Sequence, residues 1–185
     1  MVLQKILIWI LIAFLIVMTT FYFYITYIFL YTVISRKAPF VSSFDRHLKL
    51  MIGKLKLQKW KTMIDLWCWS WKALRFFIKN FDLRSCEWYD FDRTAILQWK
   101  IINKIKWQKK IKLIRSKFEN ADLKKYDYIY LYLRPNQLDK MQNWVFSNIK
   151  KDTIVISNSF KFANKKPFEV IKNEKGVDSI FLYKN

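Results

Sequence analysis

The stretch MIDLWCWSWKALRFF, residues 63–77, starts with the pattern of a buried strand and ends with the pattern of a helix. Trp67, Trp69 and Trp71 occupy alternate positions of the turn that joins the two elements. A turn this tight usually carries glycine, which reaches the required backbone angles without strain. Packing explains one indole at such a place, but it does not explain three in alternation.

Glycine is scarce and tryptophan is abundant throughout the chain. Glycine makes up about 7% of ordinary proteins, which predicts roughly 13 in a chain of this length. The 185 residues contain Gly 2 and Trp 9. An α/β fold with so little glycine lacks residues for turns with positive φ.

The chain carries a formal net charge of +20. A strongly basic balance is typical of proteins that bind nucleic acid or an anionic membrane surface. A/T-rich codons, which favour Lys, Ile, Asn, Phe and Tyr, explain the same balance equally well. Because the basic residues form no arm or Arg-rich stripe, we expect no nucleic-acid partner.

Cys68, Cys86 and His47 indicate neither a disulfide framework nor a metal site. Two cysteines are too few for such a framework, and their spacing from the one histidine is not that of metal ligands. We expect reduced, packed thiols, no bound metal, and a histidine that lies at the surface or packs against a helix.

The N-terminal region has the pattern of a membrane-spanning helix. Residues 6–34 contain no charged residue. This uncharged stretch is longer than the roughly 20 apolar residues that span a bilayer, and longer than the apolar region of a cleavable signal peptide. Only Lys5 precedes the span, whereas Arg36 and Lys37 follow it. The positive-inside rule therefore predicts a single-pass protein of the cell membrane with a cytoplasmic C-terminal domain.

The patterns divide the chain into a transmembrane anchor at 1–35, a connector with an amphipathic helix at 36–58, and one domain at 59–185. In this domain, short β-type runs alternate with segments of helical spacing. The runs lie at 62–66, 86–90, 111–115, 128–133, 153–157, 168–171 and 179–183, and the helical segments at 72–80, 93–104 and 136–149. The alternation predicts an α/β fold with a mostly parallel sheet, helices on both faces, and an antiparallel hairpin from the last two runs.

The first strand-to-helix turn is where open α/β sheets collect ligands. With glycine at 67, 69 and 71, the segment DLWCWSWK would read DLGCGSGK. That segment resembles the first motif of the class I S-adenosylmethionine-dependent methyltransferases, which have a Rossmann-like fold. The resemblance implies that S-adenosyl-L-methionine is the cofactor and that Asp65 orients the turn and the amino-acid end of the cofactor. It also implies that Trp67, Cys68, Trp69 and Trp71 supply backbone contacts.

The resemblance extends to CEWYDFD at the end of the second expected strand. Asp90 lies where the family carries an acid that accepts hydrogen bonds from the ribose hydroxyls, about 20 residues after the turn. Trp88 occupies a position where glycine commonly precedes this acid, and Trp60 and Trp107 lie in expected loops that also suit glycine. Lys117 departs from the family, in which many members carry an acid or amide facing the adenine.

One interpretation explains the glycine deficit together with these positions. Some bacterial lineages decode UGA as glycine, and a translation that reads UGA as tryptophan would place Trp at glycine sites. The interpretation applies to the turn tryptophans and to Trp60, Trp88 and Trp107, while Trp9 and Trp144, like Trp99, lie in expected helices and stay undecided. The alternative is that the tryptophans are genuine.

Within the family, the chain is most similar to small membrane-anchored protein-lysine methyltransferases that act on the ATP synthase c subunit. The similarity rests on APFV at 38–41, DYIYLYLRP at 127–135 and VISNSFKF at 155–162. It implies a membrane-associated protein substrate, methylated on lysine.

Near the end of the fourth expected strand, Tyr132, Arg134 and Pro135 are candidate substrate contacts, with core packing and loop formation as their alternative roles. Methyl transfer is an in-line displacement that needs no metal, and the sequence assigns no catalytic residue. The alternatives to the enzyme are a non-enzymatic, membrane-anchored, basic and aromatic-rich binding protein, a degenerate methyltransferase, or a binder of single-stranded nucleic acid.

Overall fold

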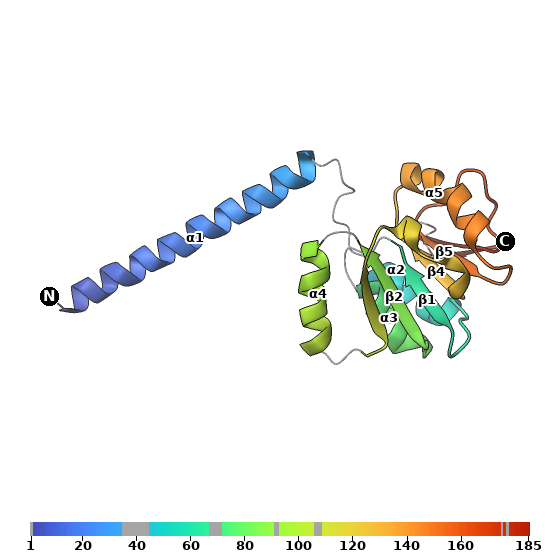
Figure 1. The fold of residues 1–185 in the computed structure, drawn as a ribbon, viewed down its shortest axis with the longest axis horizontal. Coiled ribbons are helices and arrows are strands. Elements are labelled where there is room, and N and C mark those ends of the chain that lie inside the picture. Colours follow the sequence, from blue (N-terminus) through green and yellow to red (C-terminus); the bar gives the residue numbers. More distant parts are fainter. Residues whose placement is uncertain are drawn as a thin grey trace. The chain divides into compact units, whose positions relative to one another are not determined.

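The computed structural model describes residues 2–34, 45–66, 72–90, 93–105, 109–174, 176 and 178–185 (Figure 1). The chain separates into two compact units, Met1–Val41 and Ser42–Asn185. Each unit is described by itself.

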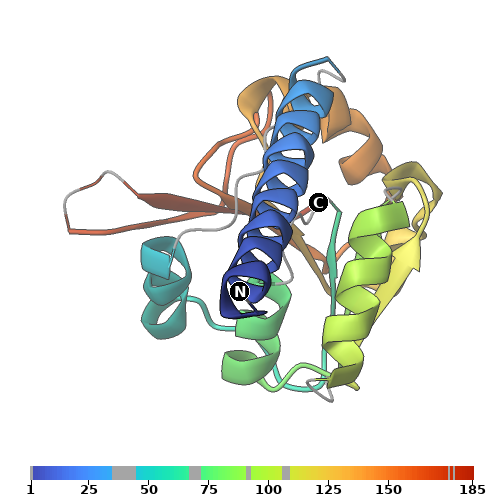
Figure 2. The same cartoon turned by 90° about the vertical axis from the view of Figure 1, so that its left-hand side faces the viewer.

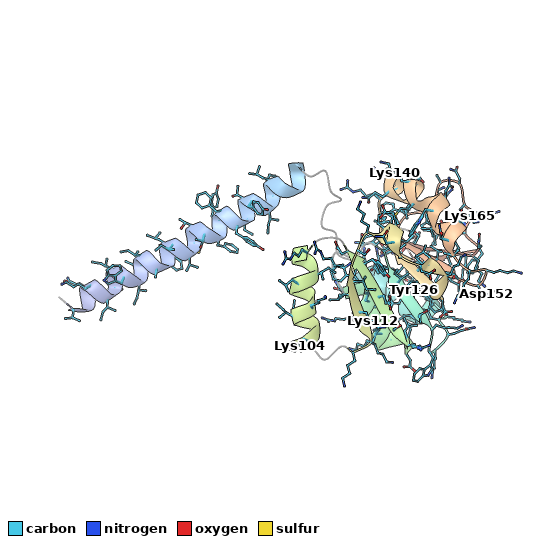
Figure 3. All side chains as sticks on the ribbon, viewed as in Figure 1. Lys104, Lys112, Tyr126, Lys140, Asp152 and Lys165 are labelled. Atoms are coloured by element: carbon cyan, nitrogen blue, oxygen red, sulfur yellow. The ribbon has the colours of Figure 1, made fainter. Side chains whose placement is uncertain are left out.

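The first unit is a single long helix, α1 (Val2–Ile34). Its stretch Gln4–Leu30, 27 residues that include an 18-residue window with a mean hydropathy of 2.6, is long and apolar enough to cross a membrane, and none of that window is buried. Apolar side chains project from it along its length (Figure 3). The hydroxyls of Thr19, Thr20 and Thr26 donate to backbone carbonyls one turn earlier, so these polar groups are satisfied within the helix.

The second unit is built on a seven-stranded sheet in the order β3-β2-β1-β4-β5-β7-β6. The first five strands pair in parallel, whereas β7 pairs antiparallel with both β5 and β6. The strands are β1 (Thr62–Asp65), β2 (Ser85–Asp90), β3 (Ile111–Arg115), β4 (Tyr128–Leu131), β5 (Ile154–Asn158), β6 (Glu169–Lys172) and β7 (Ser179–Tyr183). In the view of Figure 2 the β6–β7 hairpin, drawn in red, extends from one edge.

Helices cover the two faces of the sheet and create two cores. Side chains of α2 (Asp45–Lys54) and α3 (Lys72–Phe81) pack with Met63, Trp88 and Tyr130 on one face. On the other face, α5 (Pro135–Asn148) packs with Ile64 and Leu131. The remaining helices are α4 (Arg93–Ile105), which contacts β2 and β3, and two short 3₁₀ turns, η1 (Phe118–Asn120) and η2 (Leu123–Lys125).

The predicted fold class is confirmed. All seven expected strands and the three expected domain helices are present, with ends within two residues of the predicted ones. The run expected to continue to 133 ends at Leu131, shortly before α5 begins at Pro135. The two last strands form the expected hairpin, but β7 rather than β6 joins β5.

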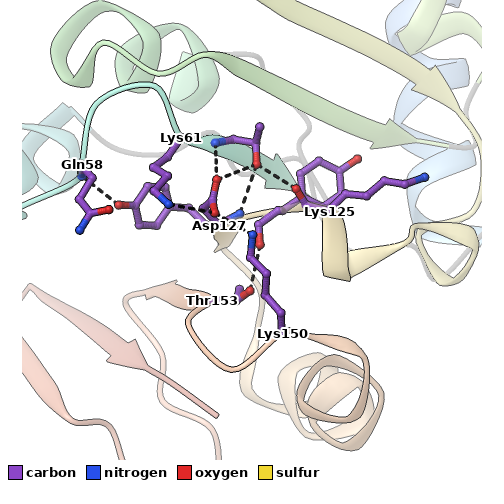
Figure 4. A network of polar contacts seen from close by, with 9 residues as sticks. Gln58, Lys61, Lys125, Asp127, Lys150 and Thr153 are labelled. Atoms are coloured by element: carbon purple, nitrogen blue, oxygen red, sulfur yellow. Dashed lines mark hydrogen bonds and ion pairs between the residues drawn. The ribbon is translucent and has the colours of Figure 1, made fainter.

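A half-buried carboxylate joins the amino ends of the parallel strands (Figure 4). Asp127 accepts hydrogen bonds from Thr62 N at 2.9 Å, Thr62 Oγ1 at 3.1 Å and Lys150 Nζ at 2.7 Å. Burial by itself raises the pKa of this carboxyl, but the bonds from Lys150 and Thr62 outweigh it and lower the pKa to about 2. Asp127 therefore stabilises the end of the sheet opposite to the expected ligand site.

Candidate active site

The strand order reverses between β1 and β4. The connection from β1 to β2 runs through α3 on one face, and the connection from β4 to β5 runs through α5 on the other. In open α/β sheets, ligands bind outside the carboxyl ends of the strands at this reversal. The residues that end β1, β2 and β4 are thus the ones to consider.

Asp65 is the last residue of β1, and its side chain is buried, 2% exposed. It lies opposite Trp88 on β2 and opposite Tyr130 on β4. Since residues opposite each other in a parallel ladder point to the same face, the carboxylate is flanked by two fully buried aromatic rings.

Asp90 ends β2 two residues after Trp88, and so it shares the face of Asp65. Its side chain is half-buried, and its backbone carbonyl accepts a hydrogen bond from Ser116 N at 3.0 Å. Asp65 and Asp90, the two carboxylates predicted from the sequence, thus lie at the carboxyl ends of neighbouring strands.

Cys86 is a buried free thiol on the same face. Burial, assisted by the negative charge of Asp65, raises the pKa of this thiol. It therefore stays protonated, which is the behaviour of a packed thiol rather than of a nucleophile.

The turn that carries the motif, with Trp67, Cys68, Trp69 and Trp71, lies outside the described residues, as does Trp107. Lys117 is described and exposed, and it directly precedes η1.

The three candidate substrate residues fall in different environments. Tyr132 is half-buried, and its ring lies 6.2 Å from the His47 ring in an edge-to-face arrangement. Burial raises the pKa of the Tyr132 hydroxyl, although a hydrogen bond with Ser159 acts in the opposite direction. Arg134 and Pro135 are exposed where α5 begins, and Pro135 is the first residue of that helix.

His47 is not a surface residue, since only 4% of it is exposed. Its Nε2 lies 2.7 Å from Asp178 Oδ1, and its Nδ1 lies 3.0 Å from Ser159 Oγ. The sequence alone does not predict this cluster, because His47 is more than 100 residues away from both of its partners and no local spacing connects them.

Among the described residues, no group of three or more His, Cys, Asp or Glu side chains is arranged to hold a metal ion. The arrangement instead offers two carboxylates, aromatic rings and a hydrogen-bonded histidine around one edge of the sheet. Carboxylates and a hydrogen-bonded imidazole are groups that can bind and orient a polar ligand.

A scan against models of protein families finds no match for this sequence, and neither does a search of curated proteins. Solved structures do match. An RNA methyltransferase from Salinibacter ruber, crystallised with S-adenosyl-L-homocysteine, superimposes with a TM-score of 0.68 at 14% identity, over 78% of this chain and 93% of that chain.

Two further structures match over most of their lengths. A protein described as a methyltransferase from Escherichia coli gives a TM-score of 0.63 at 13% identity, over 80% of this chain and 90% of that chain. A precorrin-6y C5,15-methyltransferase from Geobacter metallireducens gives 0.55 at 9% identity, over 79% and 94%. The chain has a Rossmann-like methyltransferase fold.

Proposed function

We propose that this chain is an S-adenosylmethionine-dependent methyltransferase. The observation that carries the proposal is the placement of Asp65 and Asp90 on one face, at the carboxyl ends of adjacent strands beside the reversal of the sheet. Asp90 accepts hydrogen bonds from the ribose hydroxyls, and Asp65 orients the turn that follows β1. The complex of the Salinibacter ruber enzyme with S-adenosyl-L-homocysteine supports this choice of cofactor.

In methyl transfer, the main task of the protein is to position the cofactor and the acceptor. The cofactor supplies a methyl group on a sulfonium, and the chain has to hold the acceptor in line with it at contact distance. Half-buried Asp90 fixes one end of the ligand, while the residues after β4 and β5 are placed to hold the acceptor.

The tryptophans at motif positions are glycines in the native protein under this proposal. Trp60 supports it, because its φ is 61° and its side chain is 69% exposed. A bulky residue in the left-handed region is a genuine outlier, whereas glycine adopts it freely.

Trp144, in contrast to Trp60, lies at a position that suits tryptophan. It is half-buried within α5, and its ring packs edge-to-face with Phe118 at 5.5 Å. That contact favours a genuine tryptophan at this helical position.

The proposal is tested by calorimetry with S-adenosyl-L-homocysteine on two full-length chains. One has the printed sequence, and the other carries Trp67→Gly, Trp69→Gly, Trp71→Gly and Trp88→Gly. We expect binding only by the second chain, because glycine lets the backbone approach the cofactor where a side chain would exclude it. Absence of binding by the glycine chain would remove the proposal, and UGG codons at these positions would remove its decoding part.

We further propose that the enzyme is held at the cell membrane by α1, with its catalytic unit in the cytoplasm, and that it methylates a lysine of a membrane-associated protein. The apolar stretch Gln4–Leu30 supports the anchor. The net charge of +20 favours an anionic lipid surface, at about 1 kcal/mol per basic residue close to it. An anchored enzyme meets membrane-bound substrates at a raised effective concentration. Protease treatment of intact spheroplasts, which leaves a cytoplasmic domain uncut, tests this orientation.

A degenerate methyltransferase is the second candidate, and the burial of Trp88 favours it. An indole that is 0% exposed beside Asp65 fits a chain whose cofactor cleft has been filled by its own core. This candidate predicts UGG codons and no binding of S-adenosyl-L-homocysteine by either chain.

A further inference from the structure

Ser159, His47 and Asp178 form a continuous line of hydrogen bonds at the carboxyl edge of the sheet. His47 lies in the first turn of α2, Ser159 directly follows β5, and Asp178 directly precedes β7. His47 Nε2 is 2.7 Å from Asp178 Oδ1, and Ser159 Oγ is 3.0 Å from His47 Nδ1. His47 and Asp178 are buried, whereas Ser159 is half-buried.

The partners of the imidazole decide which nitrogen carries the proton. Asp178 Oδ1 accepts only, and Arg46 Nε lies closer to it, at 3.0 Å, than to His47 Nε2, at 3.4 Å, so His47 Nε2 is the nitrogen that donates to Asp178. Nδ1 of the neutral ring is then an acceptor, and the one proton of the Ser159 hydroxyl can be donated either to it at 3.0 Å or to Asn158 Oδ1 at 3.1 Å. The tautomer is assigned from these contacts.

The backbone holds Ser159 in an unusual conformation. Its φ is 69°, and its N–H donates to Ser179 O at 2.9 Å. Its hydroxyl also lies 3.1 Å from Asn158 Oδ1, and Asn158 Nδ2 donates to the Tyr130 hydroxyl at 2.8 Å. A strained position kept by several bonds is typical of a functional site.

The cluster lies on the β4–β5 side of the reversal between β1 and β4. The carboxylates Asp65 and Asp90 belong to β1 and β2, whereas Tyr132 and Ser159 follow β4 and β5 on the other side of the reversal. Tyr130, opposite Asp65, connects the two sides through Asn158. A ligand that extends from Asp90 across β1 ends near Tyr132 and Ser159.

We propose, on the basis of the proposed function, that these three residues relay the proton of a primary amine acceptor. The amine of lysine has a reference pKa near 10.4, so it is almost wholly protonated at neutral pH and cannot attack a sulfonium. In the proposed step, the ammonium gives a proton to Ser159 Oγ while the hydroxyl proton of Ser159 passes to His47 Nδ1. The imidazolium is paired with Asp178.

The nitrogen lone pair then forms the bond to the methyl carbon. The electron pair of the breaking carbon–sulfur bond stays on sulfur, which leaves S-adenosyl-L-homocysteine and an N-methyl ammonium. General base catalysis of this kind contributes about 10² to 10⁴ in rate.

The experiment uses the full chain with Trp67→Gly, Trp69→Gly, Trp71→Gly and Trp88→Gly in detergent micelles, and the probe N-acetyl-lysine methylamide. His47→Gln keeps a donor and an acceptor on the side chain but cannot take up a proton. We expect its affinity for S-adenosyl-L-homocysteine to stay within about twofold, while methyl transfer to the probe falls about 100-fold or more. Ser159→Ala should lose a similar factor, and added imidazole should restore transfer in His47→Ala.

Asn173→Ala is the matched control. Asn173 Nδ2 donates to Asp178 Oδ2 at 2.9 Å, and Asn173 Oδ1 accepts from Asp178 N at 3.3 Å, so the change weakens the same corner of the fold but removes no atom that takes part in the bonds among Ser159, His47 and Asp178. We expect lower stability and nearly full transfer.

A second measurement does not depend on turnover. His47 is the one histidine of the chain, so its ring signals are unique in an NMR spectrum. In the complex with S-adenosyl-L-homocysteine, N-acetyl-lysine methylamide should shift these signals, and its Nε-acetylated counterpart should not. Unshifted signals, or full transfer by His47→Gln, would overturn the relay while cofactor binding stays intact. Loss of S-adenosyl-L-homocysteine binding by the glycine chain would remove the proposed function itself.

Discussion

Trp88 and Asp65 lie directly opposite each other in the parallel ladder between β2 and β1, and both side chains are buried. The indole therefore occupies the volume next to the carboxylate that we assign to the cofactor site. Trp88 therefore contributes to the stability of the fold and also fills space that a bound cofactor would need.

Trp88→Gly should lower the stability of the ligand-free protein and create a response to ligand. Removal of a buried Trp side chain typically costs about 3–5 kcal/mol, because a cavity remains. S-adenosyl-L-homocysteine at 100 times its dissociation constant should then restore about 2.7 kcal/mol. Both effects are measured by thermal unfolding at several ligand concentrations. The two chains compared both carry Trp67→Gly, Trp69→Gly and Trp71→Gly, and only one of them also carries Trp88→Gly.

Trp144→Ala serves as the control for that measurement. It removes another partly buried indole, in contact with Phe118 on the other face of the sheet. The midpoint of thermal unfolding should fall in this variant, and it should not rise when the ligand is added. An equal response from both variants would indicate ligand binding away from Asp65.

Trp60→Gly should stabilise the chain. A left-handed backbone costs an L-residue about 1–2 kcal/mol, and glycine avoids this cost. The indole is 69% exposed, with Lys110 Nζ 5.6 Å from the ring, so little packing is lost. We expect a gain of about 1 kcal/mol in urea unfolding. Trp60→Ala keeps the strained φ of 61° and should bring no such gain.

The sequence predicted the elements of the fold well because their signals are local. Apolar runs and helical spacing located every strand of the sheet to within two residues. The insertion of β7 between β5 and β6 was not predictable in this way, since strand order depends on pairing between distant segments.

The residues of the candidate site were likewise predictable only where their signal is local. Asp65 and Asp90 were found because each ends a strand at a spacing that a motif fixes. His47 was read as a surface or helix-packing residue, because its partner Asp178 lies 131 residues away. Long-range hydrogen bonds leave no pattern in one sequence.

Asp90→Asn should weaken the binding of S-adenosyl-L-homocysteine by about 10-fold to 100-fold in the glycine chain. A hydrogen bond to a charged group contributes about 1.5–3 kcal/mol, and the amide removes the charge while keeping the shape. Calorimetry against Asp152→Asn, a change at an exposed turn residue after α5, provides the comparison. Equal affinities in the two variants would take Asp90 out of the ribose-binding role.

Asp127→Asn should destabilise the second unit without affecting ligand contacts. Its carboxylate accepts bonds from Lys150 Nζ at 2.7 Å and Thr62 N at 2.9 Å, at the amino ends of the strands. The fall of its pKa from 3.8 to about 2 corresponds to about 2 kcal/mol of stability. Because the folded-state pKa is the lower one, this contribution is complete above about pH 4 and is lost as the pH falls toward 2.

Urea unfolding of the parent chain and of Asp127→Asn between pH 7 and pH 2 measures that contribution. We expect a difference of about 2 kcal/mol at pH 7 that narrows as the parent carboxylate becomes protonated. Lys150→Met removes the ion pair from the other side and should reproduce part of the loss at pH 7, because the bonds from Thr62 remain. A gap between parent and Asp127→Asn that stays constant down to pH 2 would show that packing, and not the charge on Asp127, stabilises this end of the sheet.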